Sequence, residues 1–342
     1  VGITGSNAKS TVTDLLGRMA RRAGLKVGVG GNAGVPALDL LAEKHDYYLL
    51  ELSSFQLERA GPLPLELAVL LNLSADHLDR HSDLENYRAA KQKIFQAARA
   101  IVVNRQDHES LPKVGNPEIY SSYGLDAPAP GQFGLRTDAG VDWLCRGQQR
   151  LLPVSELGLL GRHNLANALA CLALGSAMEL PMPAMLEELR RYTGLPHRCE
   201  PVATIAGIRF INDSKATNTG AAVAALEGLG EPAKIVLIAG GQGKGADFES
   251  LREPVGRFCK AVVLVGEDAS RMAEALAGKA PLYRANSMED AVTQAGELAT
   301  AGDVVLLSPA CASFDMFDNF SRRGECFTAA VKNLQRGWAH EQ

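Results

Sequence analysis

Hydrophobic and polar positions along this chain follow two alternating patterns. Short continuous apolar runs, rich in β-branched residues, are separated by longer stretches in which apolar residues recur three and four positions apart. Continuous apolar runs are typical of strands buried on both faces, and the wider spacing is typical of helices packed on a sheet. In the first half, the expected strands are 1–4, 26–29, 47–52, 67–73 and 101–104, with helices at 10–23 and 84–98. The pattern predicts an α/β fold with a mostly parallel sheet.

The pattern changes after residue 115 and restarts after residue 196. Residues 115–155 are rich in Pro and Gly and predict a small antiparallel insert, followed by helices at 163–178 and 184–192. The Thr-Gly-Leu-Pro stretch 193–196 is typical of a hinge. Beyond it we expect strands at 208–212, 235–239, 261–265 and 304–307, and helices at 220–226, 269–276 and 287–298, the last opened by a Ser287 cap. We therefore expect two domains, 1–195 and 196–342.

Composition narrows the class of protein. With 342 residues, of which 46% are hydrophobic and 22% charged, the chain suits two soluble globular domains. The formal net charge of −4 argues against a nucleic-acid or anionic-membrane partner. The six cysteines are scattered without a C-x-x-C pair, which favours reduced cytoplasmic thiols over disulfides or a zinc site. No apolar run approaches the ~18 residues that a membrane span needs.

The strongest chemical signal lies at residues 1–11. A β-branched run is followed by a small-residue turn that closes on Lys9-Ser10-Thr11, and a helical pattern begins there. This order is typical of a phosphate-binding loop, in which backbone N–H groups face the phosphates, the lysine reaches the outer phosphates and the hydroxyl binds Mg²⁺. The nucleotide-binding candidates are Gly5, Ser6, Asn7, Ala8, Lys9, Ser10 and Thr11. The alternative is an ordinary strand–helix turn.

Two features of this loop are unusual. The glycine that normally precedes the lysine is replaced by Ala8, which we expect to fit if its φ is negative. The chain also opens inside the first strand, so we expect a further segment to precede it.

Polar residues follow two other buried strands. Glu51 and the pair Asp76-His77 come at strand C-termini, where ligands bind in open α/β sheets. A carboxylate there can share Mg²⁺ with Ser10, and the added imidazole suggests a second metal ion. The alternative for Asp76 is a cap on a helix or turn. Lys91 lies on a helix with another lysine and, taken alone, is typical of a solvated surface charge.

The second half carries further anion-binding candidates. Arg198 follows the hinge and can clamp phosphate, although a solvated linker charge is the favoured interpretation of this residue taken alone. Residues 213–218 and 240–245 form a polar loop and a glycine-rich turn, and Ser313 follows a strand. The aromatic residues after it, Phe314, Phe317 and Phe320, are of a kind more often found in a core. Together these signals predict anion-binding loops on both domains, facing one another across a hinge.

In combination these motifs resemble the Mur ligase family, from one end of the chain to the other. The matching stretches are 4–11, 30–32, 51–58, 76–80, 163–167, 195–198, 212–218, 240–248 and 308–324. The resemblance implies a central P-loop ATPase domain with a mostly parallel sheet, followed by a Rossmann-like α/β C-terminal domain that binds the amino acid. It also implies an N-terminal UDP-binding domain ahead of residue 1. Ala8, Ala75 and Gln242 depart from the family pattern.

The resemblance further implies a cytoplasmic, monomeric, ATP- and Mg²⁺-dependent ligase of peptidoglycan precursor synthesis. Such an enzyme joins D-glutamate to UDP-N-acetylmuramoyl-L-alanine through an acyl phosphate. By this resemblance Lys9, His77 and Lys91 are catalytic, and the metal ligands for two Mg²⁺ ions are Ser10, Glu51, His77 and a carbamylated Lys91. ATP would also contact Asn167, Arg198 and Asp213. The substrate-binding residues would be Asn32, Lys215, Thr217, Lys244, Ser313 and Phe320.

Two alternatives stay open. One is a ligase similar to folylpolyglutamate synthase, which shares the architecture and uses a pterin substrate. The other is a nucleotide-binding module without turnover of its own.

Overall fold

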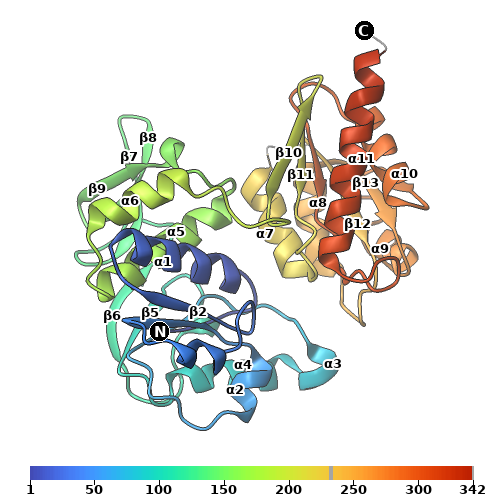
Figure 1. Cartoon of the computed structure of the whole chain (residues 1–342). Coiled ribbons are helices and arrows are strands. Elements are labelled where there is room, and N and C mark those ends of the chain that lie inside the picture. The colour runs from blue at the N-terminus through green and yellow to red at the C-terminus, as the bar shows by residue number, and fades with distance from the viewer. Residues whose placement is uncertain (231–233, 341–342) are drawn as a thin grey trace. The chain divides into compact units, whose positions relative to one another are not determined.

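The computed structural model describes residues 1–230 and 234–340. The chain divides into two compact units (Figure 1). The first unit comprises Val1–Leu159 and Asn164–Thr193, and the second comprises Leu160–His163 and Gly194–Gln342. Within the described residues, every helix is too short or too polar to cross a bilayer.

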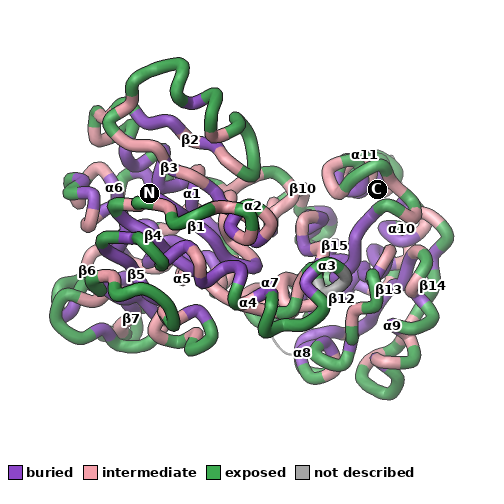
Figure 2. The backbone as a smooth tube through the Cα atoms, turned by 90° about the horizontal axis from the view of Figure 1, so that it is seen from below, coloured by how far each residue is buried: buried purple, intermediate pink, exposed green. Residues whose placement is uncertain are grey.

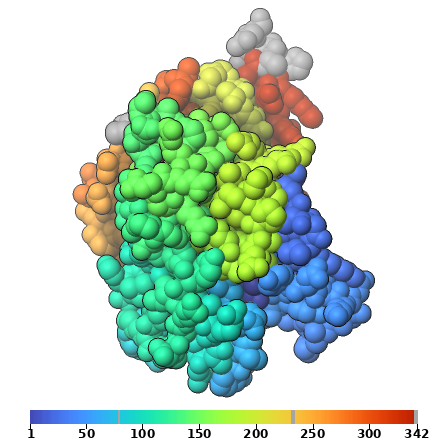
Figure 3. Space-filling model, turned by 90° about the vertical axis from the view of Figure 1, so that its left-hand side faces the viewer, coloured from blue at the N-terminus to red at the C-terminus, as the bar shows by residue number. Residues whose placement is uncertain are grey.

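The first unit is built on a mixed sheet with the strand order β2-β3-β1-β4-β5-β6-β7-β8-β9. Neighbouring strands are parallel from β2 to β7, and β8 and β9 are antiparallel additions at the surface (Figure 3). The strands are β1 (Gly2–Thr4), β2 (Val27–Gly31), β3 (Tyr47–Glu51), β4 (Leu67–Leu70), β5 (Ala100–Asn104), β6 (Glu118–Tyr123), β7 (Phe133–Asp138), β8 (Val141–Arg146) and β9 (Gln149–Pro153). The predicted mostly parallel sheet is confirmed. The antiparallel insert expected over 115–155 is confirmed only for β7–β9, because β6 instead extends the parallel sheet.

Helices cover both faces of this sheet, because its central strands are apolar on both sides. In β4, Leu67 and Val69 pack into one hydrophobic cluster, whereas Ala68 and Leu70 pack into another. The first cluster includes residues of α1 (Lys9–Arg22), α5 (Arg162–Ala177) and α6 (Met182–Arg191). The second includes residues of α2 (Ser54–Arg59) and the 3-10 turn η2 (Lys93–Phe95), which follows α4 (Leu84–Gln92). Figure 2 shows the buried strands between these layers.

The second unit has the strand order β10-β11-β15-β12-β13-β14, parallel except for the edge pair β10–β11. Its central strands again alternate between two clusters. The strands are β10 (Glu200–Ile205), β11 (Ile208–Asn212), β12 (Ile235–Gly240), β13 (Cys259–Val265), β14 (Leu282–Arg284) and β15 (Val304–Leu307). The helices are α7 (Thr219–Leu229), α8 (Arg252–Phe258), α9 (Ala269–Leu276), α10 (Met288–Leu298) and α11 (Phe320–His340). The predicted Ser287 cap of α10 is confirmed, since its side chain accepts a hydrogen bond from the Asp290 N–H.

The structure differs from the sequence-based elements in three places. The predicted strand 67–73 ends at Leu70, and the Leu73 N–H turns to the Asp107 carboxylate, 2.8 Å away. The predicted helix 84–98 becomes a 3-10 turn after Gln92. The strands β10 and β14 were not predicted, because these edge strands are half-exposed and lack a continuous apolar run. The helices α8 and α11 were not predicted either. The remaining short elements are η1 (Asp39–Ala42), α3 (Leu78–His81), η3 (His108–Ser110), η4 (Val154–Glu156) and η5 (Glu249–Leu251).

Candidate functional site

The phosphate-binding loop lies between β1 and α1, as predicted. It is fixed by Asn72 at the end of β4: the Asn7 N–H donates to Asn72 Oδ1 at 2.8 Å, and the Ser6 N–H donates to the Asn72 carbonyl at 3.0 Å. The Lys9 ammonium donates to the carbonyls of Gly5 at 2.7 Å and Ser6 at 2.9 Å. The loop therefore curls around its own cation, which is the group that would meet the outer phosphates of a nucleotide.

Ala8 has a left-handed backbone, with φ of 68° and ψ of −7°. A negative φ was the condition under which alanine was expected to fit here, and this condition is not met. Left-handed geometry costs a residue with a Cβ roughly 1–2 kcal/mol, and glycine avoids this cost. Ala8 is also the residue just before α1, and its side chain caps nothing. The loop keeps its shape despite this residue, because neighbouring hydrogen bonds define it.

Lys91 is buried and lies under the same loop. Its side chain is 1% exposed, and its ammonium donates to the Gly5 carbonyl at 2.8 Å and contacts Thr4 Oγ1 at 3.4 Å. Its nitrogen also lies 4.8 Å from the centre of the Tyr87 ring. Burial first, and then the positive charge of Lys9, lower the pKa of Lys91 well below its usual value. The surface-charge interpretation of Lys91 is therefore wrong.

Glu51 and Asn32 are joined at the ends of two adjacent strands. Asn32 Nδ2 donates to Glu51 Oε1 at 2.9 Å, and the Asn32 N–H donates to the Glu51 carbonyl at 2.8 Å. A Cβ on Gly31, where φ is 111°, would lie 2.3 Å from that carbonyl, so the close approach requires glycine. Glu51 is 3% exposed, whereas Asn32 is exposed. The carboxylate of this pair is therefore buried, whereas the amide is open to solvent.

Asp76 and His77 form a turn ahead of α3. The His77 N–H donates to Asp76 Oδ1 at 2.9 Å, and His77 Nε2 lies 3.7 Å from Asp76 Oδ2. His77 has a φ of 53°, and its side chain is 45% exposed. One Asp76 oxygen thus accepts the N–H of its neighbour His77, while the other faces the imidazole.

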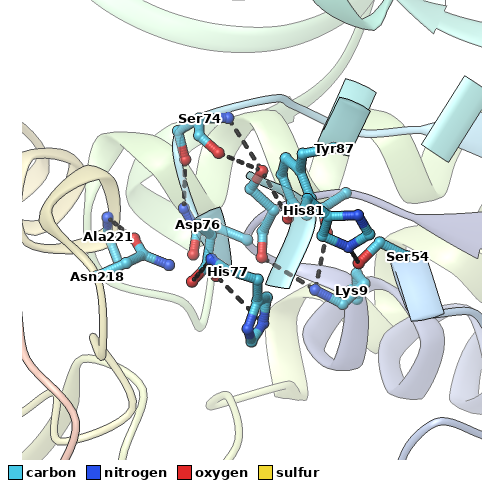
Figure 4. A network of polar contacts seen from close by, with 12 residues as sticks. Lys9, Ser54, Ser74, Asp76, His77, His81, Tyr87, Asn218 and Ala221 are labelled. Carbon is cyan, nitrogen blue, oxygen red and sulfur yellow. Dashed lines mark hydrogen bonds and ion pairs between the residues drawn. The ribbon is translucent and has the colours of Figure 1, made fainter. Parts of the chain in front are cut away.

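A cluster of rings that the sequence did not suggest supports this turn (Figure 4). The His81 ring stacks on Phe55 at 5.5 Å and packs against Tyr87 at 5.4 Å, and His81 Nε2 lies 3.0 Å from Ser54 Oγ. The Tyr87 hydroxyl donates to Ser6 Oγ in the phosphate loop at 3.2 Å. Burial lowers the pKa of His81, which favours the neutral form of its ring. These contacts hold α3 and α4 against the loop; nothing in the spacing of the residues predicts them.

The residues present fit a cation at this place. Both Glu51 and Asp76 act electrostatically to raise the pKa of Lys91, so two carboxylates act on its nitrogen. The Lys91 and Lys9 ammonium groups both donate to the Gly5 carbonyl. Their positive charges stand where a bound metal ion would otherwise neutralise the carboxylates. Among the described residues, three or more His, Cys, Asp or Glu side chains nowhere meet as a ready-made metal site. A metal here would need Ser10 or a modified Lys91 as a further ligand.

Two predicted nucleotide contacts of the second unit, Arg198 and Asp213, lie on neighbouring segments. Asp213 Oδ1 accepts the Cys199 N–H at 3.1 Å, and Asp213 Oδ2 accepts the Ser308 hydroxyl at 2.9 Å. Burial raises the pKa of Asp213 to about 7. Arg198, half-buried, precedes Cys199 directly. In the first unit, Asn167 lies on α5, where its Nδ2 donates to Asn164 Oδ1 at 2.9 Å.

Of the five predicted substrate residues in the second unit, three take part in two cation–aromatic contacts: Lys215, Phe320 and Lys244. The Lys215 ammonium lies 4.2 Å from the centre of the Phe320 ring. Lys244 is exposed and lies 5.4 Å from the centre of the Phe314 ring. Phe314 is 63% exposed, so its interpretation as a core residue is wrong, whereas Phe317 packs against a hydrophobic cluster.

The other two predicted substrate residues lie in the loops nearby. Ser313 is buried, and its carbonyl accepts the Phe317 N–H at 2.8 Å. The Thr217 N–H donates to the Lys215 carbonyl at 2.8 Å, which tightens the turn after β11. Thr217 is half-buried.

Arg323 was not among the predicted residues, yet it organises these loops. Its guanidinium is 1% exposed and donates to the Ser214 carbonyl at 2.8 Å, to Ser214 Oγ at 3.0 Å and to the Cys311 carbonyl at 3.0 Å. Burial lowers the pKa of Arg323 to about 10. The buried Arg323 guanidinium therefore joins the loop after β11 to the loop after β15. In the sequence, only its place in the stretch 308–324, which matches the family pattern, pointed to it.

Comparison with known proteins gives the same assignment over nearly the whole chain. Residues 3–175 match the Mur ligase middle domain, and residues 197–311 match the Mur ligase, glutamate ligase domain. The UDP-N-acetylmuramoylalanine--D-glutamate ligase of Pseudomonas putida is 56% identical over 338 residues, which cover 98% of this chain and 75% of that protein.

Solved structures share the fold at low sequence identity. A pseudomurein peptide ligase type C from Methanothermus fervidus matches with a TM-score of 0.72 and 15% identity, covering 97% of this chain and 78% of that one. The E. coli FolC structure, in complex with DHPP and ADP, matches with a TM-score of 0.69 and 17% identity, covering 98% of this chain and 88% of that one. The fold is therefore common to several ligases, whereas the sequence match is to the D-glutamate ligases. The chain belongs to the Mur ligase family.

Proposed function

We propose that this chain carries out the ATP-dependent joining of D-glutamate to UDP-N-acetylmuramoyl-L-alanine in peptidoglycan precursor synthesis. The observation that carries the proposal is the 56% identity to a D-glutamate ligase over 98% of the chain. The geometry supports it: a phosphate-binding loop with two lysines on one carbonyl suits phosphoryl transfer, where positioning and charge neutralisation supply most of the catalysis. Residues 1–195 would bind ATP, and residues 196–342 would bind the amino acid.

ATP would lie with its phosphates on residues 5–11, where Lys9 meets the outer phosphates. Asn167 on α5, together with Arg198 and Asp213, would contact the nucleotide. The chain's task is then to hold the γ-phosphoryl group in line with the carboxylate of UDP-N-acetylmuramoyl-L-alanine. Transfer of that group gives an acyl phosphate and ADP. The D-glutamate amine attacks the acyl carbon, loses a proton, and phosphate leaves as the amide forms.

Mur ligases use ATP and Mg²⁺, and we propose two Mg²⁺ ions here. Ser10 and Glu51 would hold one, and His77 would help to hold the second; when bound, the ions neutralise charge on the phosphates. The buried Lys91 amine, whose pKa is lowered, is the form that can add to CO₂. The amine then loses a proton and becomes a carbamate, which is an anionic oxygen ligand suited to Mg²⁺.

The remaining predicted residues would bind the two substrates. Asn32, exposed beside Glu51, would contact the muramoyl substrate. Lys244 and Ser313 offer a cation and a hydroxyl suited to a D-glutamate carboxylate, and Phe320 would pack beside them. Lys215 and Thr217 would line the same region. We further propose that the enzyme acts as a cytoplasmic monomer, without nucleic-acid or membrane partners.

The test is phosphate release from ATP in the presence of UDP-N-acetylmuramoyl-L-alanine, with and without D-glutamate. We expect release that depends on D-glutamate and is lost in Lys9→Ala. A pterin acceptor in place of the muramoyl substrate should give none; turnover with the pterin would favour a folylpolyglutamate-synthase-like ligase. ATP binding without any D-glutamate-dependent release would instead indicate a nucleotide-binding module.

A further inference from the structure

His163 sits in a closely fitted socket of the second unit. The segment Leu160–His163 groups with that unit, although the rest of α5 groups with the first. His163 Nδ1 lies 3.2 Å from the Ala224 carbonyl on α7, and His163 Nε2 lies 3.6 Å from Cys199 Sγ. The imidazole therefore links the first turn of α5 to two other segments of the second unit.

Two glycines make room for this ring. A Cβ on Gly228 would lie 2.6 Å from His163 Nδ1, and a Cβ on Gly161 would lie 2.8 Å from His163 Cε1. Gly161 also has a φ of 91°, which disfavours any residue with a side chain. Because neither Gly161 nor Gly228 has a side chain, the space between them can hold the His163 imidazole.

The hydrogen-bond partners settle which nitrogen carries the proton. A carbonyl can only accept, so His163 Nδ1 donates to Ala224, and Nε2 is left as an acceptor 3.6 Å from the Cys199 sulfur; the Asp213 carboxylate is a second acceptor for the same thiol. Burial, and then the Asp213 carboxylate, raise the pKa of Cys199 well above its usual value. The sulfur therefore stays protonated, which makes it a donor rather than a nucleophile.

Cys199 also defines the backbone on which Arg198 sits. His197 and Cys199, on either side of Arg198, both have left-handed backbones with φ of 62° and 48°. Such a conformation persists only where surrounding contacts hold it. His197 Nδ1 is held by Asn212 Nδ2 at 3.0 Å, and Cys199 is held by His163 at its sulfur and by Asp213 at its N–H.

We propose that His163 and Cys199 are positioning residues for the nucleotide. Their contact, made within the second unit, holds the backbone from which the Arg198 side chain projects. This inference rests on the proposed function, in which Arg198 and Asn167 contact ATP. It adds two residues that touch neither the substrates nor the reacting atoms.

The test measures the Kd for ATP by titration calorimetry, with the melting temperature of each variant recorded beside it. Cys199→Ala removes the donor, and His163→Asn keeps an amide near Nδ1 for Ala224 but cannot reach the sulfur. We expect each to raise the Kd about 3- to 10-fold, the range for one lost hydrogen bond. The double variant should be no worse than either single one, because both remove the same contact. His163→Gln, with an amide near Nε2, should restore part of the affinity.

Cys259→Ala is the matched control, since this thiol is buried in the same unit on β13, away from the predicted site residues. The inference is overturned if Cys199→Ala changes the Kd no more than Cys259→Ala does while both lower the melting temperature. It is also overturned if the effects of Cys199→Ala and His163→Asn multiply in the double variant. Should Cys199→Ala fail to fold, Cys199→Ser supplies the comparison, with a smaller rise in Kd expected. If the unaltered protein does not bind ATP, the proposed function fails, and this inference with it.

Discussion

The Lys91 ammonium donates a 2.8 Å hydrogen bond to the carbonyl of Gly5, and the Lys9 ammonium donates to the same carbonyl. Two lysines thus share one carbonyl in a region where one of them is almost fully buried. Like charges repel, and removing a cation from water is costly, so this arrangement is unfavourable for stability alone. A functional demand on the position explains it better than packing does.

Replacing Lys91 separates function from stability. We expect Lys91→Met to abolish D-glutamate-dependent phosphate release while leaving the free energy of unfolding unchanged or raising it, because an apolar side chain removes the cost of burying charge. Activity assays and urea unfolding on one preparation check this. A Met variant that loses about 3 kcal/mol or more would show that Lys91 is a structural residue.

The proposed carbamate has its own signature. Activity of the unaltered enzyme should fall when bicarbonate and dissolved CO₂ are removed and recover when bicarbonate is returned. Lys91→Ala should be inactive under both conditions. Indifference of the unaltered enzyme to bicarbonate would contradict the carbamate without affecting the assignment of the ligase.

Ala8→Gly should stabilise the protein. At a φ of 68° glycine avoids the steric cost that alanine bears, so we expect a gain of about 1 kcal/mol in the free energy of unfolding. The control is Ala20→Gly in the interior of α1, which should lose about 1 kcal/mol or more. Urea unfolding measures both. If Ala8→Gly is also destabilising, the left-handed geometry at this residue is not strained.

Asp213 should make stability depend on pH. Its pKa rises from 3.8 to about 7 on folding because the folded state buries it. The folded state therefore favours the protonated form, and its contribution to stability falls as pH rises through this window, then stays level above pH 7. Asp213→Asn cannot titrate, so it should gain stability relative to the unaltered protein by up to a few kcal/mol (~1.4 per pKa unit) between pH 4 and pH 8. Parallel pH curves for the two proteins would contradict the raised pKa.

Arg323→Lys tests the buried guanidinium. A lysine cannot supply the planar set of donors that meets Ser214 and Cys311, so we expect a loss of roughly 2–4 kcal/mol in the free energy of unfolding. The KM for D-glutamate should rise, because the loop that carries Ser313 loses its hydrogen bond from the Arg323 guanidinium to the Cys311 carbonyl. Arg322→Lys is the control: Arg322 is exposed and pairs only at the surface with Glu325, so neither quantity should change. Equal effects at both positions would show that Arg323 has no special role.

The amino-acid sequence determined the class of fold and the chemistry of the first loop. Continuous apolar strands alternate with amphipathic helices, and this local pattern predicts a parallel sheet without knowledge of distant contacts. The phosphate-binding loop was likewise predicted from its order, because strand, loop and helix must follow one another in the chain, and Glu51 and His77 were predicted from their places after buried strands. Resemblance to a known family supplied the remaining residue roles.

Tertiary structure decided what depends on residues far apart in the chain. Lys91 lies 86 positions from the carbonyl that it meets, so its burial cannot be seen in the helix that carries it. The backbone angle of Ala8 follows from contacts with Asn7 and Asn72 around it, which no propensity describes. The socket of His163 and the ties of Arg323 depend in the same way on several segments meeting. Side-chain burial and hydrogen-bond partners are properties of the packed chain, and local sequence contains neither.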